Sequence, residues 1–228
     1  MSDYRGKVHM EIIPITSHYF FTVNAYLVKT ENRYFLIDTG MAKKRAQFEK
    51  ELQEAGCKPG DLKFIIITHG HLDHIGNAAY LRDKYEVKVA MHKGDYNMIE
   101  TGNMFVDARG IMVKLINFIM NVFGLSKYEK FTPDLYLDDN QNLSALGIDA
   151  TIIHTPGHSE GSIGIITAAG DFFCGDLLVN TDKPAKNTLI DNPTEMEASF
   201  ERLRSLDIKT VYPGHGKPFQ MQQLRELC

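Results

Sequence analysis

The first third of the chain alternates apolar and polar positions in a way that predicts strands followed by a helix. Val23, Ala25 and Leu27 alternate with other side chains, as in a half-buried strand. Residues 41–55 place apolar side chains at helical spacing, and Gly56 follows as a stop signal. Aromatic and β-branched residues are concentrated in the predicted strands, which cover residues 8–15, 19–29 and 34–37.

The second half of the chain repeats this alternation of strands and helix. Asn192 can cap a helix, Pro193 suits its first turn, and Glu195 can complete a capping box. Strands, helix, strands and helix predict an α/β protein with two mixed β-sheets packed face to face and helices on the outer faces, a four-layer αββα sandwich. A length of 228 residues fits one such domain over 1–228. The predicted strands of this half are 148–154, 162–167 and 171–174.

A helical apolar insertion is expected between the two halves, at about 95–130. Residues 111–123 are almost wholly apolar, and Lys114, Asn117 and Asn121 form one narrow polar stripe. The segment is too short to span a bilayer. It is interpreted either as a lid over a substrate site or, with nearly equal weight, as core or a homodimer interface. The expected lid residues are Ile111, Leu115, Phe118 and Ile119.

Composition and charge narrow the class of protein. An apolar share of 43% and a charged share of 24% are those of an ordinary globular domain. The net charge of −4 and the lack of a Lys/Arg block argue against a nucleic-acid partner. No signal peptide is recognisable, and the three cysteines are too few for a disulfide framework. We therefore expect a cytoplasmic protein without a membrane span, acting on a small molecule.

The chemistry is concentrated in residues 69–74, His-Gly-His-Leu-Asp-His, which place four metal-ligand side chains within six positions. They follow the apolar run 64–67, which predicts a buried strand with the ligands on the loop at its end. Imidazoles and carboxylates suit zinc first, with iron or manganese as alternatives. Together with three later residues beside glycines, they are enough to hold two divalent metal ions. The predicted ligands are His69, His71, Asp73, His74, His158, Asp176 and His215.

The order and spacing of these seven residues resemble the metallo-β-lactamase fold superfamily. The resemblance extends from residues 36–40, Leu-Ile-Asp-Thr-Gly, to residues 213–216, Pro-Gly-His-Gly. It implies the αββα sandwich and a dinuclear, metal-dependent hydrolase. It also implies that His69, His71 and His158 hold one metal, that Asp73, His74 and His215 hold the other, and that Asp176 bridges the two.

Such a cluster generates a hydroxide at neutral pH, which attacks a carbonyl or phosphoryl centre. Asp73 is predicted to be catalytic, orienting that hydroxide and passing its proton to the leaving group. Asp38 is predicted to accept the outer N–H of a ligating histidine, because such histidines usually have an acceptor behind them. The alternative for Asp38 is a cap of the turn before Gly40.

Departures from the family pattern favour one kind of substrate. Many true β-lactamases of this fold have Arg where His74 stands, and glyoxalase II carries a helical substrate domain that has no counterpart beyond Phe219. Lactonases of the fold resemble this chain in size and share all seven ligands. We therefore expect hydrolysis of an ester-like carbonyl bond, a thioester or a lactone. The alternatives are a phosphodiesterase with the same cluster and a non-catalytic, metal-containing ligand-binding or regulatory protein.

Overall fold

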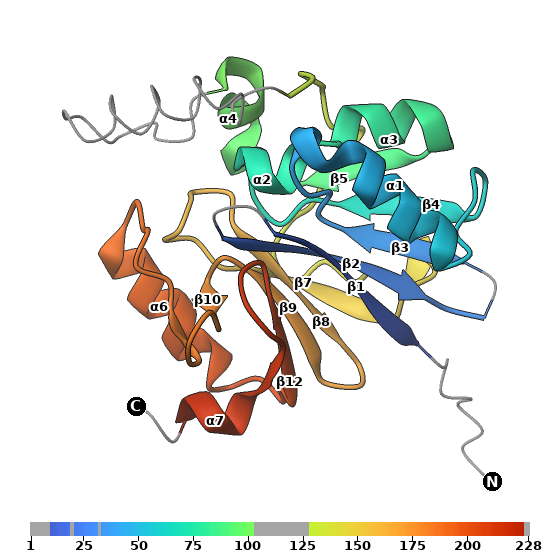
Figure 1. Cartoon of the computed structure of the whole chain (residues 1–228). Helices are drawn as coiled ribbons and strands as arrows, with labels where there is room; N and C mark the ends of the chain where they lie inside the picture. The colour runs from blue at the N-terminus through green and yellow to red at the C-terminus, as the bar shows by residue number, and fades with distance from the viewer. Residues whose placement is uncertain (1–9, 19–20, 32, 103–127, 226–228) are drawn as a thin grey trace, which may run out of the picture.

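Two β-sheets pack face to face, and helices cover both outer faces (Figure 1). The structure is a computed structural model, and it describes residues 10–18, 21–31, 33–102 and 128–225. The predicted α/β class and the αββα layering are confirmed.

The first sheet has six strands in the order β1-β2-β3-β4-β5-β6. Neighbours are antiparallel from β1 to β3 and parallel from β3 to β6, so the sheet is mixed. The strands are β1 (Glu11–His18), β2 (Thr22–Lys29), β3 (Tyr34–Ile37), β4 (Leu62–Ile66), β5 (Lys88–Met91) and β6 (Leu135–Tyr136). The associated helices are η1 (Ala42–Lys44), α1 (Arg45–Glu54), α2 (Leu72–Ile75), α3 (Ala78–Tyr85), η2 (Lys93–Asp95) and α4 (Tyr96–Thr101).

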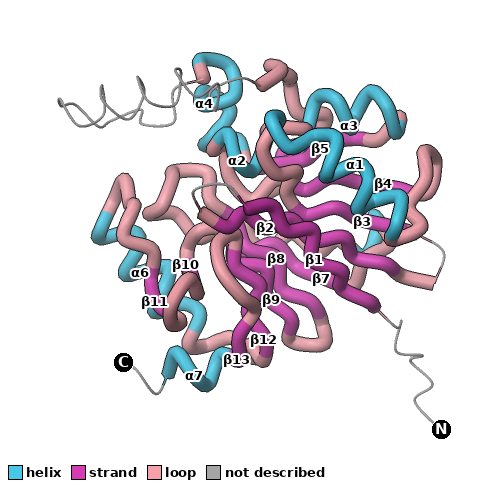
Figure 2. The backbone as a smooth tube through the Cα atoms, in the orientation of Figure 1, coloured by secondary structure: helices cyan, strands magenta, loops and turns pink. Residues whose placement is uncertain are grey.

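The second sheet has five strands in the order β13-β12-β9-β8-β7, and α6 and α7 lie beside it (Figure 2). Strands β9 and β12 are parallel, and the other pairs are antiparallel. The strands are β7 (Ala150–His154), β8 (Ile163–Thr167), β9 (Asp171–Gly175), β12 (Thr210–Pro213) and β13 (Phe219–Gln220). The other elements are η3 (Ser144–Leu146), the hairpin of β10 (Leu178–Val179) and β11 (Ala185–Lys186), α6 (Pro193–Leu203) and α7 (Met221–Arg225).

Strand β2 shows how the layers are separated. Ala25 and Leu27 belong to the core between the first sheet and its helices, which includes Phe48 of α1. Tyr26 belongs to the core between the sheets, which includes Ile152 of β7. Successive side chains of a strand point to opposite faces, so both faces of β2 are covered. The interpretation of β2 as half-buried is therefore wrong, because the second sheet covers the face that was expected to meet water.

Helix α6 begins where the sequence predicts it. The Asn192 side chain accepts hydrogen bonds from the backbone N–H groups of Thr194 (3.1 Å) and Glu195 (3.2 Å), and Pro193 occupies the first turn. Phe200 and Leu203 then pack on the outer face of the second sheet. This helix closes the fourth layer of the sandwich.

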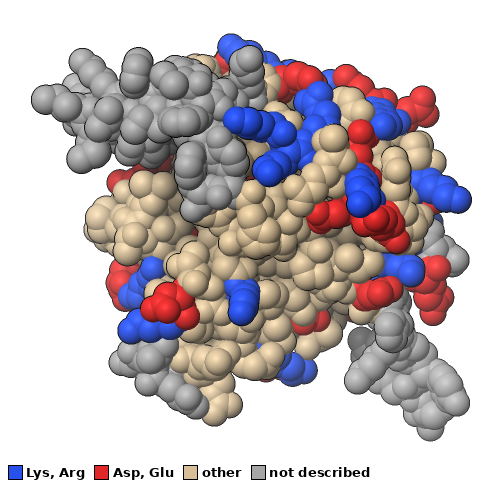
Figure 3. All heavy atoms as spheres, viewed as in Figure 1, with Lys and Arg blue, Asp and Glu red and all other residues tan. Residues whose placement is uncertain are grey.

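The predicted insertion is described only in part. Helices η2 and α4 occupy its beginning, while residues 111–123 lie outside the described residues. The lid residues Ile111, Leu115, Phe118 and Ile119 fall there too, so the lid and the dimer interface stay predictions. In the part of the chain that is described, no helix is long and apolar enough to cross a membrane. Charged side chains of both signs lie side by side on the face shown in Figure 3, many of them over α1.

The strand directions bring the candidate residues together. Strands β3, β4 and β5 are parallel, and β7, β9 and β12 also share one direction in the second sheet. The backbone N–H of Ile163 in β8 donates to the carbonyl of Thr68 beyond β4 (2.9 Å), and the N–H of Asn24 in β2 donates to the carbonyl of Gly214 beyond β12 (2.8 Å). These two hydrogen bonds join the first sheet to the second at the edge where strands of both sheets end.

Candidate metal centre

The motif 69–74 directly follows Thr68, beyond the end of β4. It is divided between a loop and a helix. His69 and His71 lie on the loop, whereas Asp73 and His74 lie in the four-residue helix α2. His71 has an extended backbone (φ −70°, ψ 146°) and precedes the first helical residue. The expectation that all four ligands sit on a loop is therefore wrong for Asp73 and His74. The helical turn directs these two side chains differently from the two histidines on the loop.

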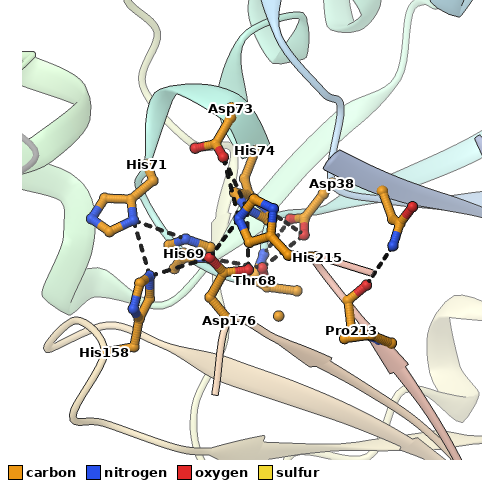
Figure 4. Close-up of polar contacts among 12 residues, drawn as sticks. Asp38, Thr68, His69, His71, Asp73, His74, His158, Asp176, Pro213 and His215 are labelled. Atoms are coloured by element: carbon orange, nitrogen blue, oxygen red, sulfur yellow. Dashed lines mark hydrogen bonds and ion pairs between the residues drawn. The ribbon is translucent and has the colours of Figure 1, made fainter. Parts of the chain in front are cut away.

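The structure brings all seven predicted ligand residues together at the sheet edge (Figure 4). Three groups have ligand atoms within 4.8 Å of one another. We call His69, His71 and His158 the three-histidine group, and Asp73, His74 and His215 the aspartate group. The remaining group joins Asp176 to His69 and His74, so Asp176 lies between the other two groups.

Asp176 contacts both groups with its two carboxylate oxygens. Its Oδ2 lies 2.9 Å from Nε2 of His215 and 3.6 Å from Nε2 of His158. Its Oδ1 lies 3.4 Å from Nε2 of His74. One carboxylate therefore reaches ligand atoms on either side, which is the geometry that a bridging ligand requires.

Two histidines are oriented by backbone carbonyls. Nδ1 of His158 lies 2.6 Å from the carbonyl oxygen of Leu189, and Nδ1 of His215 lies 2.6 Å from that of Thr22. A carbonyl oxygen can only accept, so the proton of each ring is on Nδ1. In a neutral ring the lone pair is then on Nε2, which faces the cluster.

Asp38 orients two further histidines. Its Oδ2 accepts from Nδ1 of His74 (2.8 Å) and from Oγ1 of Thr68 (2.8 Å), and its Oδ1 accepts from the Thr68 N–H (2.8 Å). Because the Thr68 hydroxyl gives its proton to Asp38, it is an acceptor for Nδ1 of His69 (3.0 Å). Asp38 therefore turns Nε2 of His74 inward directly and Nε2 of His69 through Thr68.

The inward nitrogens of the three-histidine group face one another. Nδ1 of His71 lies 3.2 Å from Nε2 of His69 and 3.0 Å from Nε2 of His158. The latter two nitrogens carry lone pairs, since their rings donate from Nδ1 to Thr68 and Leu189. When Nδ1 of His71 also carries a lone pair, these nitrogens repel one another unless a cation lies between them. These imidazoles are the donors that zinc and related metals prefer.

Two buried atoms indicate a cation on the other side of the centre. Nε2 of His74 and Oδ1 of Asp176 have no hydrogen-bond partner among the described residues. A buried polar atom without a partner costs about 1–3 kcal/mol, so such atoms are rare in folded proteins. Burial lowers the pKa of His74, but the carboxylates of Asp176, Asp38 and Asp73 outweigh it and raise that pKa. A metal ion between the two atoms would satisfy both, taking the place of the proton on Nε2 of His74. The residues therefore fit the metal ions that the sequence implies.

The three-histidine group and the aspartate group differ in charge. Burial, with His71 close by, lowers the pKa of His158 to about 4. Burial also acts on His215, but the Asp176 carboxylate outweighs it and raises the pKa of His215 to about 9. His158 is therefore uncharged at neutral pH, while His215 holds a second proton when no metal is bound. A metal ion must displace that proton, which couples metal binding to pH.

A family model for the metallo-beta-lactamase superfamily matches residues 18–215, which contain all seven ligand residues. The chain belongs to that superfamily. A probable metallo-hydrolase of Bacillus subtilis, YqjP, is 28% identical over 225 residues, covering 88% of this chain and 69% of that protein. The hydroxyacylglutathione hydrolase GloC of Haemophilus influenzae is 29% identical over 175 residues, covering 75% of this chain and 72% of that protein. With relatives named as hydrolases, this superfamily member is a metal-dependent hydrolase.

Solved structures of the superfamily share the fold. A family protein from Thermus thermophilus, TTHA1429, has a TM-score of 0.73 at 24% identity, covering 96% of this chain and 77% of that one. The protein TTHA1623, solved in a di-iron-bound form, has a TM-score of 0.71 at 26% identity, covering 93% of this chain and 96% of that one. The TTHA1623 match covers nearly all of both chains, and the single domain over 1–228 stays a prediction.

Three groups that orient the ligands are not recognisable in the sequence. The hydroxyl of Thr68 carries no metal-binding signature, and the carbonyls of Thr22 and Leu189 are backbone atoms that every residue possesses. The histidines outside the set behave differently. His92 and His154, which are not among the predicted ligands, stack on each other with ring centroids 4.2 Å apart.

We expect removal of metal to lower the thermal stability of the protein. In the metal-free cluster, Nε2 of His74 and Oδ1 of Asp176 are buried without a hydrogen-bond partner among the described residues. An ion that binds only the folded state contributes about 4 kcal/mol when its free concentration is 1,000 times its dissociation constant. The measurement is the melting temperature of chelator-treated protein, with and without added zinc, manganese or iron. Magnesium serves as the control, because histidine-rich sites suit it poorly. A melting temperature indifferent to all of them would refute a metal centre.

Asp38→Asn should weaken metal binding by about 10- to 100-fold, the usual effect of removing a group that orients a metal ligand. Asp38 has a left-handed backbone (φ +59°), which Asn tolerates well, so the fold should persist. The amide cannot accept all three protons that the carboxylate accepts, and His74 loses its fixed orientation. Affinity is measured by competition with a chromogenic chelator. The control is Asp61→Asn, which alters an exposed carboxylate that accepts only from a turn, the N–H of Lys58 at 3.1 Å. Equal affinities for Asp38→Asn and wild type would contradict the orienting role.

Proposed function

We propose that this protein hydrolyses an ester-like carbonyl bond, a thioester or a lactone, at a centre of two divalent metal ions. The observation that carries the proposal is the position of Asp176 between the three-histidine group and the aspartate group. GloC, 29% identical to this chain, is named a hydroxyacylglutathione hydrolase, a name that denotes an acyl group on glutathione. That relationship favours a thioester within the class.

The metal ions would be held by the two groups described above, with Asp176 shared between them. Zinc suits the imidazoles best, and the di-iron form of TTHA1623 makes iron the first alternative, with manganese another. When bound, such ions polarise a carbonyl oxygen and lower the pKa of water toward neutrality. The remaining contributions come from side chains of this chain.

Asp73 has the position that a catalytic carboxylate needs. Its side chain is 17% exposed, whereas that of Asp176 is 4% exposed, so Asp73 lies on the open side of the cluster. Its Oδ2 is 3.5 Å from Nε2 of His215 and 3.7 Å from Nε2 of His74. A carboxylate here can accept a proton from water and give it to the departing thiolate or alkoxide.

Exposed apolar side chains occur beside two of the ligands. Phe21 is 41% exposed and lies edge-on to the His215 ring, with centroids 5.4 Å apart. Leu189, whose carbonyl orients His158, is 49% exposed. These two residues give the surroundings of the ligands an apolar component, which suits the acyl part of a thioester or lactone better than a phosphodiester.

Basic side chains close to the metals would favour the alternative activity, that of a phosphodiesterase. The groups that orient the ligands here are instead the Asp38 carboxylate, the Thr68 hydroxyl and two carbonyls. None of these four groups carries a positive charge that would attract a phosphate. Carbonyl hydrolysis is therefore the better supported of the two activities.

The test is a substrate panel with the metal-loaded protein. Acyl-glutathione and other thioesters, lactones, phosphodiesters and a β-lactam are compared by kcat/KM at equal metal content. We expect the thioesters or the lactones to be turned over most efficiently. Turnover of phosphodiesters with none of the carbonyl substrates would reject the proposal and establish the alternative.

Asp73→Asn should reduce kcat on the best substrate by about 10²- to 10⁴-fold, the usual contribution of general acid–base catalysis. The amide keeps the shape of the side chain but cannot take up the proton. Metal content is measured on the same samples, because the loss of a ligand could also empty the site. Near-normal turnover at full metal content would show that Asp73 is only a ligand.

A further inference from the structure

Asp95, at the end of η2, is a fully buried carboxylate that connects two loops. Its Oδ2 accepts from the Gly70 N–H (2.8 Å) and from the Ser159 hydroxyl (2.7 Å), and its Oδ1 accepts from the Gly161 N–H (2.6 Å). Gly70 belongs to the loop after β4 in the first sheet. Ser159 and Gly161 belong to the loop after β7 in the second sheet. One side chain therefore joins loops of both sheets.

These loops carry the three-histidine group. Gly70 lies between His69 and His71, and Ser159 directly follows His158. Each bond to Asp95 is thus within three positions of a residue of that group. A shift of either loop would separate Nδ1 of His71 from Nε2 of His158, which now lie 3.0 Å apart. Side-chain rotation cannot compensate, because the outer nitrogens of His69 and His158 are already engaged with Thr68 and Leu189.

The backbone is closed tightly around this carboxylate. A Cβ on Gly161 would lie 2.4 Å from the Asp95 nitrogen and 2.7 Å from its Cγ. A Cβ on Gly70 would lie 3.1 Å from Cβ of Asp95 and 2.9 Å from Cβ of Met98. These approaches are closer than a side chain permits, so glycine is needed at both positions. The two loops are therefore shaped to reach Asp95.

The hydroxyls around Asp95 form an ordered chain of hydrogen bonds. Ser159 gives its proton to the carboxylate, so the Ser162 hydroxyl, 2.7 Å away, donates to Ser159. Both serines are buried. A buried carboxylate is costly unless several donors satisfy it, and here backbone and side-chain donors from both loops do so. An apolar residue could fill the space but could not hold two loops by their N–H groups.

We propose that Asp95 is a positioning residue for the three-histidine group, holding the His69–His71 loop and the His158 loop at the distance that metal binding requires. The proposal rests on the proposed function of the same centre. It assigns Asp95 no contact with metal or substrate. Its effect is on how well one group of ligands is assembled.

The experiment measures zinc affinity and the spectrum of the cobalt-substituted protein. Asp95→Asn keeps the shape but places an amide N–H₂ against an N–H or O–H donor. We expect a 10- to 100-fold loss of affinity for one of two zinc ions and an altered ligand-field spectrum, while the other ion is retained. Ser159→Ala removes one donor and leaves the carboxylate, so a smaller loss of the same ion is expected. If Asp95→Asn does not fold, Ser159→Ala provides the same comparison.

The matched control is Asp134→Asn, which alters a carboxylate that accepts the backbone N–H of Val89 in β5 at 2.9 Å and is not bonded to either ligand loop. Unchanged zinc affinity and cobalt spectrum in folded Asp95→Asn or Ser159→Ala would overturn the proposal, even if unfolding became easier. Wild-type protein that binds two zinc ions but hydrolyses no ester-like substrate would reject the proposed function alone. The comparison of zinc affinities among the variants would still decide the role of Asp95.

Discussion

The structure depends on one electrostatic constraint, which is that buried nitrogen and oxygen lone pairs of the centre face one another. Imidazole nitrogens of the three-histidine group meet at 3.0–3.2 Å, and the free atoms of His74 and Asp176 face each other at 3.4 Å. Burial excludes the water that would otherwise separate them. A positive charge makes this arrangement favourable: protons supply it in the metal-free protein, and metal ions would replace them.

That constraint is met because four of the rings are held by a hydrogen bond at the nitrogen that faces away from the centre. Carbonyls hold His158 and His215, and Asp38 holds His74 and, through Thr68, His69. The carbonyl that holds His215 comes from β2 of the first sheet, although His215 itself follows β12 of the second. The centre therefore exists only when the two sheets are docked, and the apolar core between them supports the chemistry as much as the fold.

The ligands could be predicted from the sequence because their chemical type and close spacing are local properties. The strands of the first sheet and the helix after Asn192 could be predicted for the same reason, from alternation and capping. The burial of both faces of β2 could not, since it depends on a second sheet encoded more than 100 residues later. Nor could Asp95, an acidic residue in an expected apolar insertion whose three partners come together only in the folded chain.

The two metal-binding groups differ in charge and in exposure, and this difference suggests a division of labour. The three-histidine group is buried and has only neutral donors besides the shared Asp176, so a metal ion held there would keep the less compensated positive charge and would be better placed to polarise a substrate. The aspartate group has Asp73 as its own carboxylate and is partly open to solvent through Asp73 and His215. Proton transfer needs a group that exchanges with water, and polarisation of a carbonyl needs a site from which water is excluded. The fold supplies both on opposite sides of Asp176, because each sheet contributes ligands to both groups.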